Sequence, residues 1–192
     1  VLAKRLDKGP IDTCVDAEEI RVAPEAWQAL FAAFAHAVRN AVDHGLETPE
    51  ERLAAGKPRV GRLIFSAHAK PEGIVIAIRD DGRGIDWETL AARARARGLP
   101  DATQEDLVEA LFADGVTTRD EATEISGRGL GMAALRESAR ALGARICVES
   151  ERGHGTTLSI VVPQGADAAN VPPRSNTRVR VAERIEDVLD VG

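Results

Sequence analysis

Tyrosine is absent from this chain of 192 residues, and its four Phe and two Trp bring the aromatic content to only 3%. Proteins that bind single-stranded nucleic acid usually stack the bases on aromatic side chains, so this mode of recognition is disfavoured. Basic charge is also scarce, because 31 acidic residues outnumber 25 Lys and Arg and the net charge is −6. The composition therefore argues against a nucleic-acid partner.

The chain contains two cysteines, Cys14 and Cys147, and they form no closely spaced pair. A disulfide framework and a zinc knuckle are therefore not indicated. Long apolar runs are missing too, since no stretch approaches the roughly 18 consecutive apolar residues of a membrane helix, and no signal-peptide pattern is recognisable. We therefore expect a cytoplasmic protein that does not insert into a membrane.

Hydrophobic residues make up 44% of the sequence, which is enough for one domain with a good core. After Pro163 the composition shifts to Gly, Ala, Asn and Pro, which indicates the end of that domain. We therefore predict one domain over residues 1–163. Residues 164–192 are expected to form a linker and a short C-terminal extension.

Apolar periodicity and turn residues predict a series of strands and helices inside this domain. The strands are expected at residues 11–15, 20–22, 62–67, 74–79, 145–149 and 157–162. The helices are expected at residues 24–45, 87–97, 104–112 and 132–142. The strands should pair in sequence order, the first pair around the acidic turn at 16–19 and the others as two antiparallel hairpins.

The helix predicted at residues 24–45 has two different faces. The apolar face, expected to lie in the core, carries Trp27, Phe31, Phe34, Val38 and Val42. The opposite face carries His36, Asn40, Asp43 and His44. Solvated helix faces are usually filled with strong helix formers such as Lys and Glu, whereas His, Asn and Asp are weaker ones. This polar face is therefore a candidate binding site.

A zinc ion does not explain the polar face. His36 and His44 lie about 12 Å apart along the helix axis, so one zinc ion with ligands at about 2 Å cannot bind both. His36 and Asn40 are one turn apart and converge on a smaller target. The amide oxygen of Asn40 is a hard ligand that suits Mg²⁺, with water and phosphate oxygens as its remaining ligands.

Asp80, Gly82 and Gly84 follow directly after the strand predicted at residues 74–79. One interpretation is a plain strand-to-helix turn in which Asp86 caps the next helix. The functional interpretation is that the glycines let the backbone approach a ligand while the Asp80 carboxylate accepts a hydrogen bond from an exocyclic amine. Adenine offers such an amine at this edge, whereas guanine offers an oxygen.

A polar stretch at residues 113–126 leads into Gly127, Gly129 and Gly131 at the start of the last predicted helix. Polar segments of this length in a compact domain are typical of lids and binding loops. Glycines before a helix N-terminus favour anion binding, because free N–H groups and the helix dipole attract phosphate. No strand precedes these glycines, as a Rossmann motif would require, and the chain has no Walker Gly-Lys-Ser/Thr sequence.

Taken in order, these motifs and the Gly-Thr of the last hairpin resemble the Bergerat-fold ATPases, the superfamily of gyrase, Hsp90, histidine kinases and MutL. The stretches at residues 36–47, 51–58 and 126–132 are similar to the ATP-binding catalytic domain of CheA-type chemotaxis kinases. The resemblance covers about residues 1–163. It implies an α/β (α+β) two-layer sandwich: a mixed, mostly antiparallel sheet backed by about three helices, with ATP between the helices and a mobile lid.

The resemblance also implies roles for individual residues. Asn40 would ligate Mg²⁺, and Asp80 would bind the adenine amine, with Thr156 supporting it. Further contacts with ATP are implied for Asp43, His44, Gly82, Gly84, Arg93, Thr117, Arg119, Arg128, Gly129, Leu130, Gly131 and Met132. Arg93 and Arg119 stand where the family commonly has Lys, and Val116 stands where it often has a second lid Phe.

His36 stands where the hydrolases of this superfamily typically have a Glu that activates water, and CheA has His there too. A neutral imidazole can orient or deprotonate an incoming histidine without strongly activating water. The resemblance thus implies that the chain transfers a phosphoryl group from MgATP to a separate histidine phosphotransfer domain, with a downstream response regulator and with receptor or adaptor proteins as further candidates. The open alternatives are a nucleotide-binding interaction module and a gyrase- or MutL-type hydrolase.

Overall fold

The computed structural model describes residues 8–113 and 130–165. The strands in these ranges are β1 (Ile11–Ala17), β2 (Gly61–Lys70), β3 (Gly73–Asp80), β4 (Arg145–Glu151) and β5 (Gly155–Val162). The α-helices are α2 (Pro24–Asn40), α3 (Pro49–Ala54), α4 (Trp87–Ala96), α5 (Gln104–Leu111) and α6 (Leu130–Ala141). A π-helical turn, Ala41–Gly45, continues α2, so the helix predicted to reach Gly45 changes its hydrogen-bond pattern in its last turn.

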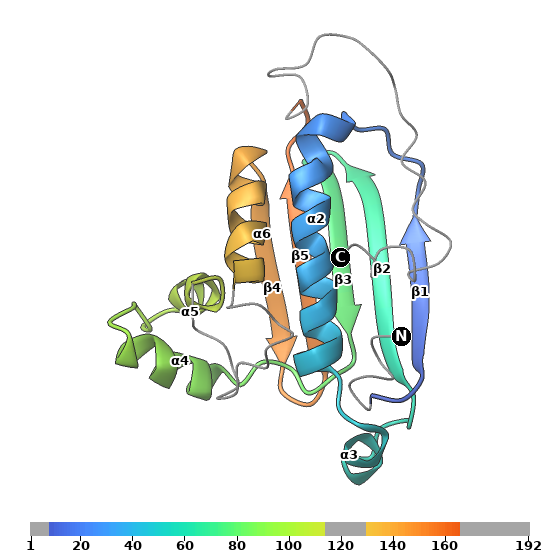
Figure 1. The fold of residues 1–192 in the computed structure, drawn as a ribbon, viewed down its shortest axis with the longest axis vertical. Helices are drawn as coiled ribbons and strands as arrows, with labels where there is room; N and C mark the ends of the chain where they lie inside the picture. The colour runs from blue at the N-terminus through green and yellow to red at the C-terminus, as the bar shows by residue number, and fades with distance from the viewer. Residues whose placement is uncertain (1–7, 114–129, 166–192) are drawn as a thin grey trace.

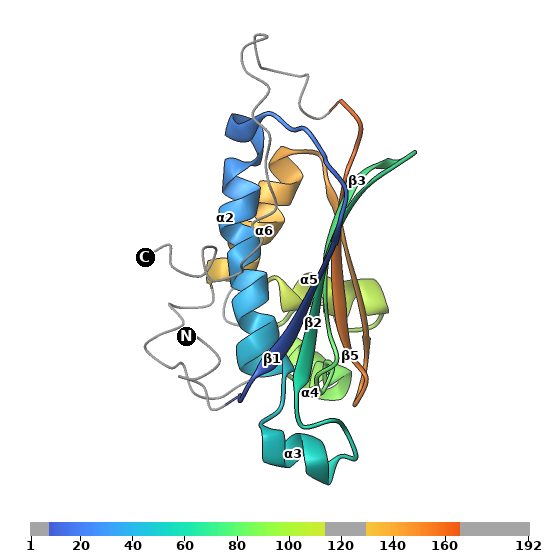
Figure 2. The same cartoon turned by 90° about the vertical axis from the view of Figure 1, so that its right-hand side faces the viewer.

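The strands form one mixed sheet in the order β1-β2-β3-β5-β4 (Figure 1). β1 pairs in parallel with β2, and the other neighbours are antiparallel. Viewed from the side, α2 and α6 form a layer on one face of the sheet (Figure 2). The predicted fold class, a two-layer α/β arrangement with a mostly antiparallel sheet, is confirmed.

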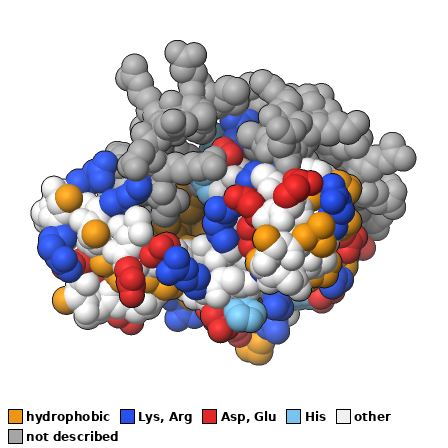
Figure 3. Space-filling view, turned by 90° about the horizontal axis from the view of Figure 1, so that it is seen from below, with side chains coloured by type: hydrophobic (Ala, Val, Ile, Leu, Met, Phe, Trp, Pro, Cys, Tyr) orange, Lys and Arg blue, Asp and Glu red, His pale blue; other side chains and the backbone are white. Residues whose placement is uncertain are grey.

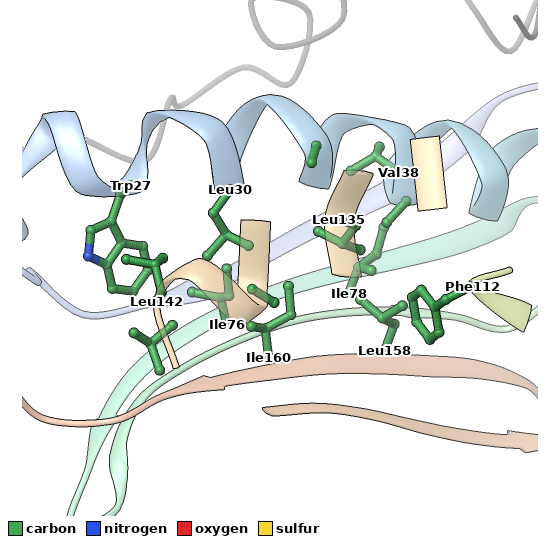
Figure 4. Packing of buried hydrophobic residues seen from close by; sticks show 14 of the residues in the cluster. Trp27, Leu30, Val38, Ile76, Ile78, Phe112, Leu135, Leu142, Leu158 and Ile160 are labelled. Atoms are coloured by element: carbon green, nitrogen blue, oxygen red, sulfur yellow. The ribbon is translucent and has the colours of Figure 1, made fainter. Parts of the chain in front are cut away.

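The core lies between this helical layer and the sheet (Figure 4). Leu30 of α2, Leu135 of α6 and Ile160 of β5 are completely buried, each with 0% of its surface exposed. At about 25 cal/mol per Å² of apolar surface, burial of each such side chain stabilises the fold by roughly 1.5–3 kcal/mol. This packing fixes α2 on the sheet, and α2 carries the polar face.

The predicted apolar stripe of α2 is wrong at one position. Phe31 is exposed at 36%, although it contacts the Trp27 ring at a centroid distance of 5.6 Å. Leu30, Ala33 and Ala37 are buried instead. The buried arc is shifted because α6 packs along α2, and small alanine side chains let two helices approach closely.

The predicted pairing of residues 11–15 with residues 20–22 is also wrong. β1 pairs with β2 over its whole length, and the Glu18 N–H continues this pairing by donating to the Ala67 carbonyl at 3.1 Å. Val22 lies in no strand and is buried in the core, with 8% of its surface exposed. The backbone groups on one side of β1 therefore pair with a strand that is distant in the sequence, which local turn signals do not reveal.

The other helix starts follow the predicted capping residues. Asp86 caps α4 by accepting from the Thr89 N–H at 3.0 Å, and Thr103 with Asp106 forms a capping box at α5. Within residues 8–113 and 130–165, no helix combines the length and the hydropathy that a membrane span requires.

Candidate functional site

The turn after β3 packs directly against the end of the long helix. The Arg83 N–H donates to the Gly45 carbonyl at 2.9 Å, which joins the turn to the π-helical end of α2. A Cβ atom at Gly82 would lie only 2.2 Å from the same carbonyl oxygen. Position 82 therefore admits only glycine, and this close backbone contact brings Asp80 to the polar face of α2.

Asp80 is a buried carboxylate, with 5% of the residue exposed. The Gly82 N–H donates to its Oδ1 atom at 2.9 Å. Loss of water on burial raises the pKa of Asp80 to about 6, backbone hydrogen bonds from Gly82 and Thr156 oppose this rise, and the negative charges of Asp81 and Glu47 add to it. A buried carboxyl with a perturbed pKa beside a polar helix face is a strong candidate for ligand binding.

The β5 side closes the site through a second tight contact. A Cβ atom at Gly155 would lie 2.1 Å from the Asp80 carbonyl oxygen, so β5 begins directly against the end of β3. The Thr156 hydroxyl contacts the Ser150 hydroxyl at 2.9 Å, and Ser150 Oγ accepts from the Ile85 N–H at 2.8 Å. Thr156 therefore reaches Asp80 through its backbone, while its side chain is held by the β4–β5 hairpin.

The polar face of α2 is partly open to solvent. His36 is exposed, whereas Asn40, Asp43 and His44 are half-buried. Asp43 Oδ2 lies 3.9 Å from His44 Nε2. A Cβ atom at Gly131 would lie 2.6 Å from His36 Cγ, so the first turn of α6 packs on the His36 ring. The structure thus brings Gly131, the one glycine of the predicted helix start among the described residues, next to His36.

The structure brings some of the predicted site residues close together and places others away from them. Asp80, Gly82 and Thr156 meet at one end of the sheet, and His36 meets Gly131. Gly84 lies in the same turn, but its position is set by β4, because a Cβ there would lie 2.3 Å from the Glu151 carbonyl oxygen. Arg93 lies on α4, beyond the β4 side of the sheet (Figure 1). Met132 is half-buried on α6 and packs against the core.

The remaining predictions fall outside the described residues. These positions are Val116, Thr117, Arg119, Arg128 and Gly129, together with most of the stretch predicted as a lid. Leu130 begins α6, but its side chain is not described.

The contact between Gly131 and His36 predicts a coupling between the two positions. Gly131→Ala should destabilise the chain by about 1–3 kcal/mol, because the new methyl group overlaps the imidazole ring. In a His36→Gly background, which removes both the ring and the His36 Cβ atom that would lie 2.7 Å away, the same change should be neutral or stabilising, since alanine is the better helix former. Urea denaturation of the four variants measures this. Equal effects in both backgrounds would show that the two residues do not touch in solution.

Sequence reasoning missed a charged cluster next to Asp80, formed by Glu47, Arg52, Lys57 and Asp81. Arg52 is among the most buried residues, with 1% of its surface exposed. Arg52 Nη2 lies 2.8 Å from Asp81 Oδ2, and Lys57 Nζ lies 2.6 Å from Glu47 Oε1. Arg52 and Lys57 stand in the stretch at residues 51–58, which carries part of the family resemblance. Seen from below, this α3 end and the α4 side border a hollow in the surface (Figure 3).

Among the described residues, no group of three or more His, Cys, Asp or Glu is placed to hold a metal ion. A metal bound entirely by protein side chains is therefore not indicated in residues 8–113 and 130–165. A metal held by one amide oxygen and by phosphate oxygens of a ligand fits the donors present, because Asn40 supplies a hard oxygen on the polar face.

Residues 27–166 match the family described as histidine kinase-, DNA gyrase B- and HSP90-like ATPase. The chain belongs to this ATPase family. Curated relatives include the chemotaxis protein CheA of Salmonella typhimurium, 39% identical over 67% of this chain, and CheA of Halobacterium salinarum, 34% identical over 84%. The chain spans 20% and 25% of these two relatives, respectively.

Solved structures agree with this family at the level of the fold. The histidine kinase domain of the Erythrobacter litoralis EL346 blue-light activated histidine kinase matches with a TM-score of 0.52 and 18% identity, over 88% of this chain and 61% of that domain. The longer structure of the same kinase gives a TM-score of 0.54 and 17% identity, over 88% of this chain and 41% of that one. These likenesses show that the chain shares its fold with histidine kinase domains.

Proposed function

We propose that this domain binds MgATP and transfers its γ-phosphoryl group to a histidine on a separate histidine phosphotransfer domain, as the catalytic domain of a CheA-like two-component kinase. The observation that carries the proposal is the buried carboxylate of Asp80, held by backbone N–H groups beside a helix face that presents His36 and Asn40. Such a carboxylate, free of a basic side-chain partner within hydrogen-bond reach in the described contacts, suits an uncharged amine donor.

Adenine recognition follows from the direction of that hydrogen bond. Asp80 accepts a bond from the exocyclic amine of adenine, whereas guanine would place an oxygen against the carboxylate. Calorimetry with MgATP and MgGTP tests this proposal directly. Strong preference for ATP is expected, and equal affinity for the two nucleotides would remove Asp80 from nucleobase recognition.

Asn40 is the residue proposed to hold Mg²⁺ on the polar face. The ion neutralises phosphate charge when it is bound, and the amide oxygen of Asn40 supplies one of its ligands. Asn40→Ala should therefore weaken ATP binding about tenfold in the presence of Mg²⁺ and have little effect in EDTA. Titrations with and without Mg²⁺ measure the difference. An Asn40→Ala domain whose ATP affinity responds to Mg²⁺ as the parent's does would show that Asn40 is not the ligand.

His36 is proposed to act on the incoming histidine of the acceptor domain. In the transfer step a nitrogen of the acceptor imidazole bonds to the γ-phosphorus, while the bond from phosphorus to the bridging β–γ oxygen breaks and ADP leaves. The proton on the attacking imidazole passes to the neutral ring of His36. The first turn of α6 packs on the His36 ring and restricts its orientation. In this mechanism the domain forms no covalent bond with the phosphoryl group, and its contribution is to position the reacting groups.

The same assignment places the domain in a signalling pathway. CheA relatives are chemotaxis proteins by name, and we extend that role to this chain. The phosphorylated acceptor domain would pass its phosphoryl group to a response regulator, and receptor or adaptor proteins would control the kinase. We also propose that the protein is located in the cytoplasm.

A further inference from the structure

The turn that holds Asp80 is itself held by the segment around α3. Four charged residues make this contact, and we call them the α3 clamp: Glu47, Arg52, Lys57 and Asp81. Arg52 donates two hydrogen bonds to the Asp81 carboxylate, at 3.1 Å from Nη1 and 2.8 Å from Nη2. Its Nε also donates to the Pro58 carbonyl at 2.7 Å. A planar guanidinium bound on two edges fixes the position of its partners.

Lys57 adds the contacts to the backbone of the turn. Its Nζ atom donates to the Asp81 carbonyl at 3.0 Å and to the Gly82 carbonyl at 2.7 Å. Glu47 Oε1 accepts the third bond from Nζ at 2.6 Å. Three donors on one ammonium group thus have three acceptors, so Lys57 is held in a single position between α3 and the turn.

The peptide group between Asp81 and Gly82 links the clamp to Asp80. Its carbonyl oxygen accepts from Lys57 Nζ and, at 3.3 Å, from Arg52 Nη1. Its N–H donates to Asp80 Oδ1 at 2.9 Å. The peptide group is planar and trans, so its carbonyl and its N–H point in opposite directions. Cations that hold the carbonyl on one side therefore aim the N–H at Asp80 on the other.

We propose that Lys57, together with Arg52, is a positioning residue for nucleobase selection: the α3 clamp orients the Asp81–Gly82 peptide so that its N–H fixes the Asp80 carboxylate in the orientation that accepts the adenine amine. The inference rests on the proposed binding of ATP through Asp80. In this proposal Lys57 and Arg52 affect the choice of nucleobase without contacting the nucleotide.

The clamp also affects the charge state of Asp80. Two positive groups on the peptide carbonyl polarise the N–H, which makes it a better donor to a carboxylate. The groups that face Asp80 are the N–H groups of Gly82 and Thr156, which favour the ionised form, and the carboxylates of Asp81 and Glu47, which oppose it. Removing the charge of Lys57 leaves these two carboxylates less neutralised, so the pKa of Asp80 should rise.

The test compares Lys57→Met with Lys57→Arg and with a matched control, Arg59→Met. Arg59 belongs to the same segment, but its ion pair with Glu50 is exposed and lies outside the clamp. Affinities of the full chain for MgATP and MgGTP are measured by calorimetry between pH 5 and 8. Lys57→Met should bind ATP about tenfold more weakly while its GTP affinity stays unchanged. The pH below which ATP binding weakens should move upward.

Lys57→Arg should keep most of the preference for ATP, and Arg59→Met should behave as the parent does. Partial unfolding would lower the affinities for ATP and GTP by the same factor. A change in the ratio of the two affinities therefore reports an effect on positioning and not on stability. If Lys57→Met does not fold because Glu47 loses a partner, Glu47→Gln/Lys57→Met is compared with Glu47→Gln instead. An unchanged ATP-to-GTP ratio in the folded variant would overturn the inference. A parent chain without preference for ATP would overturn the proposed function itself.

Discussion

Replacing His36 by Ala should slow phosphoryl transfer to a supplied histidine acceptor by about 10²–10⁴, the usual size of an acid–base contribution. Affinity for ATP should remain within a few-fold, because His36 is exposed on the α2 face and Asp80 carries the contact with the base. Transfer is followed with γ-labelled ATP and a phosphotransfer domain, and binding is followed by calorimetry on the same preparations.

His154→Ala is the matched control for this prediction. His154 lies in the β4–β5 turn with 74% of its side chain exposed, and its Nδ1 atom lies 3.4 Å from Glu151 Oε1. Its replacement should leave both binding and transfer unchanged. If His36→Ala also transfers phosphate at the parent rate, His36 has no part in proton transfer, and positioning by the rest of the site accounts for catalysis alone.

Asp80→Asn should change nucleotide binding and stability in opposite directions. Binding of ATP should weaken by about 1.5–3 kcal/mol, the range for a hydrogen bond to a charged group, because the amide is a poorer acceptor than the carboxylate. The free domain should become more stable at neutral pH by up to about 3 kcal/mol. The reason is that the pKa of Asp80 is raised from 3.8 to about 6 by burial, so ionisation of Asp80 costs stability.

The pH dependence gives the sign of this effect. Between pH 4 and 6 the folded state keeps a proton on Asp80 that the unfolded state has lost, so this group makes the parent less stable as the pH rises through that window. The stability difference between Asp80→Asn and the parent should grow over the same window and level off above pH 6. Urea unfolding at several pH values measures it. A constant difference would show that Asp80 titrates normally.

Asp86→Ala provides a contrast in the same experiment. Asp86 caps α4, and the hydrogen bond from the Thr89 N–H lowers the pKa of its carboxyl group. Loss of this cap should destabilise the chain by about 1 kcal/mol. Ionised Asp80 therefore destabilises the fold at neutral pH, whereas ionised Asp86 stabilises it. This contrast distinguishes a carboxylate that binds a ligand from one that caps a helix.

Local signals were sufficient for the elements whose ends are fixed by nearby residues. The spacing of Thr103 and Asp106 predicted the start of α5, and the structure shows both hydrogen bonds of the capping box. The hairpins β2–β3 and β4–β5 followed from alternating residues around short turns. The parallel pairing of β1 with β2 was missed, because it depends on residues about fifty positions apart that carry no local signature.

The site was predicted in part for a similar reason. Asp80, with two glycines at alternate positions after a strand, stands out in the sequence, and the structure explains Gly82 by a contact with the helix end. Arg52 did not stand out, because charged residues in a polar segment normally remain in water. Arg52 has only 1% of its surface exposed, and its charge is compensated by the carboxylates of Glu47 and Asp81. These two residues are far apart in the sequence, and only folding brings both to Arg52.

Transfer of label from ATP tests the central claim most directly. The full chain is incubated with Mg²⁺ and γ-labelled ATP, alone and with the phosphotransfer domain of a CheA relative. We expect no stable label on this chain and acid-labile label on the added domain, as phosphohistidine requires. Acid-labile label on this chain alone would contradict the account of a catalytic domain that acts on a separate acceptor. Tight ATP binding without label on any acceptor would instead indicate a nucleotide-binding module.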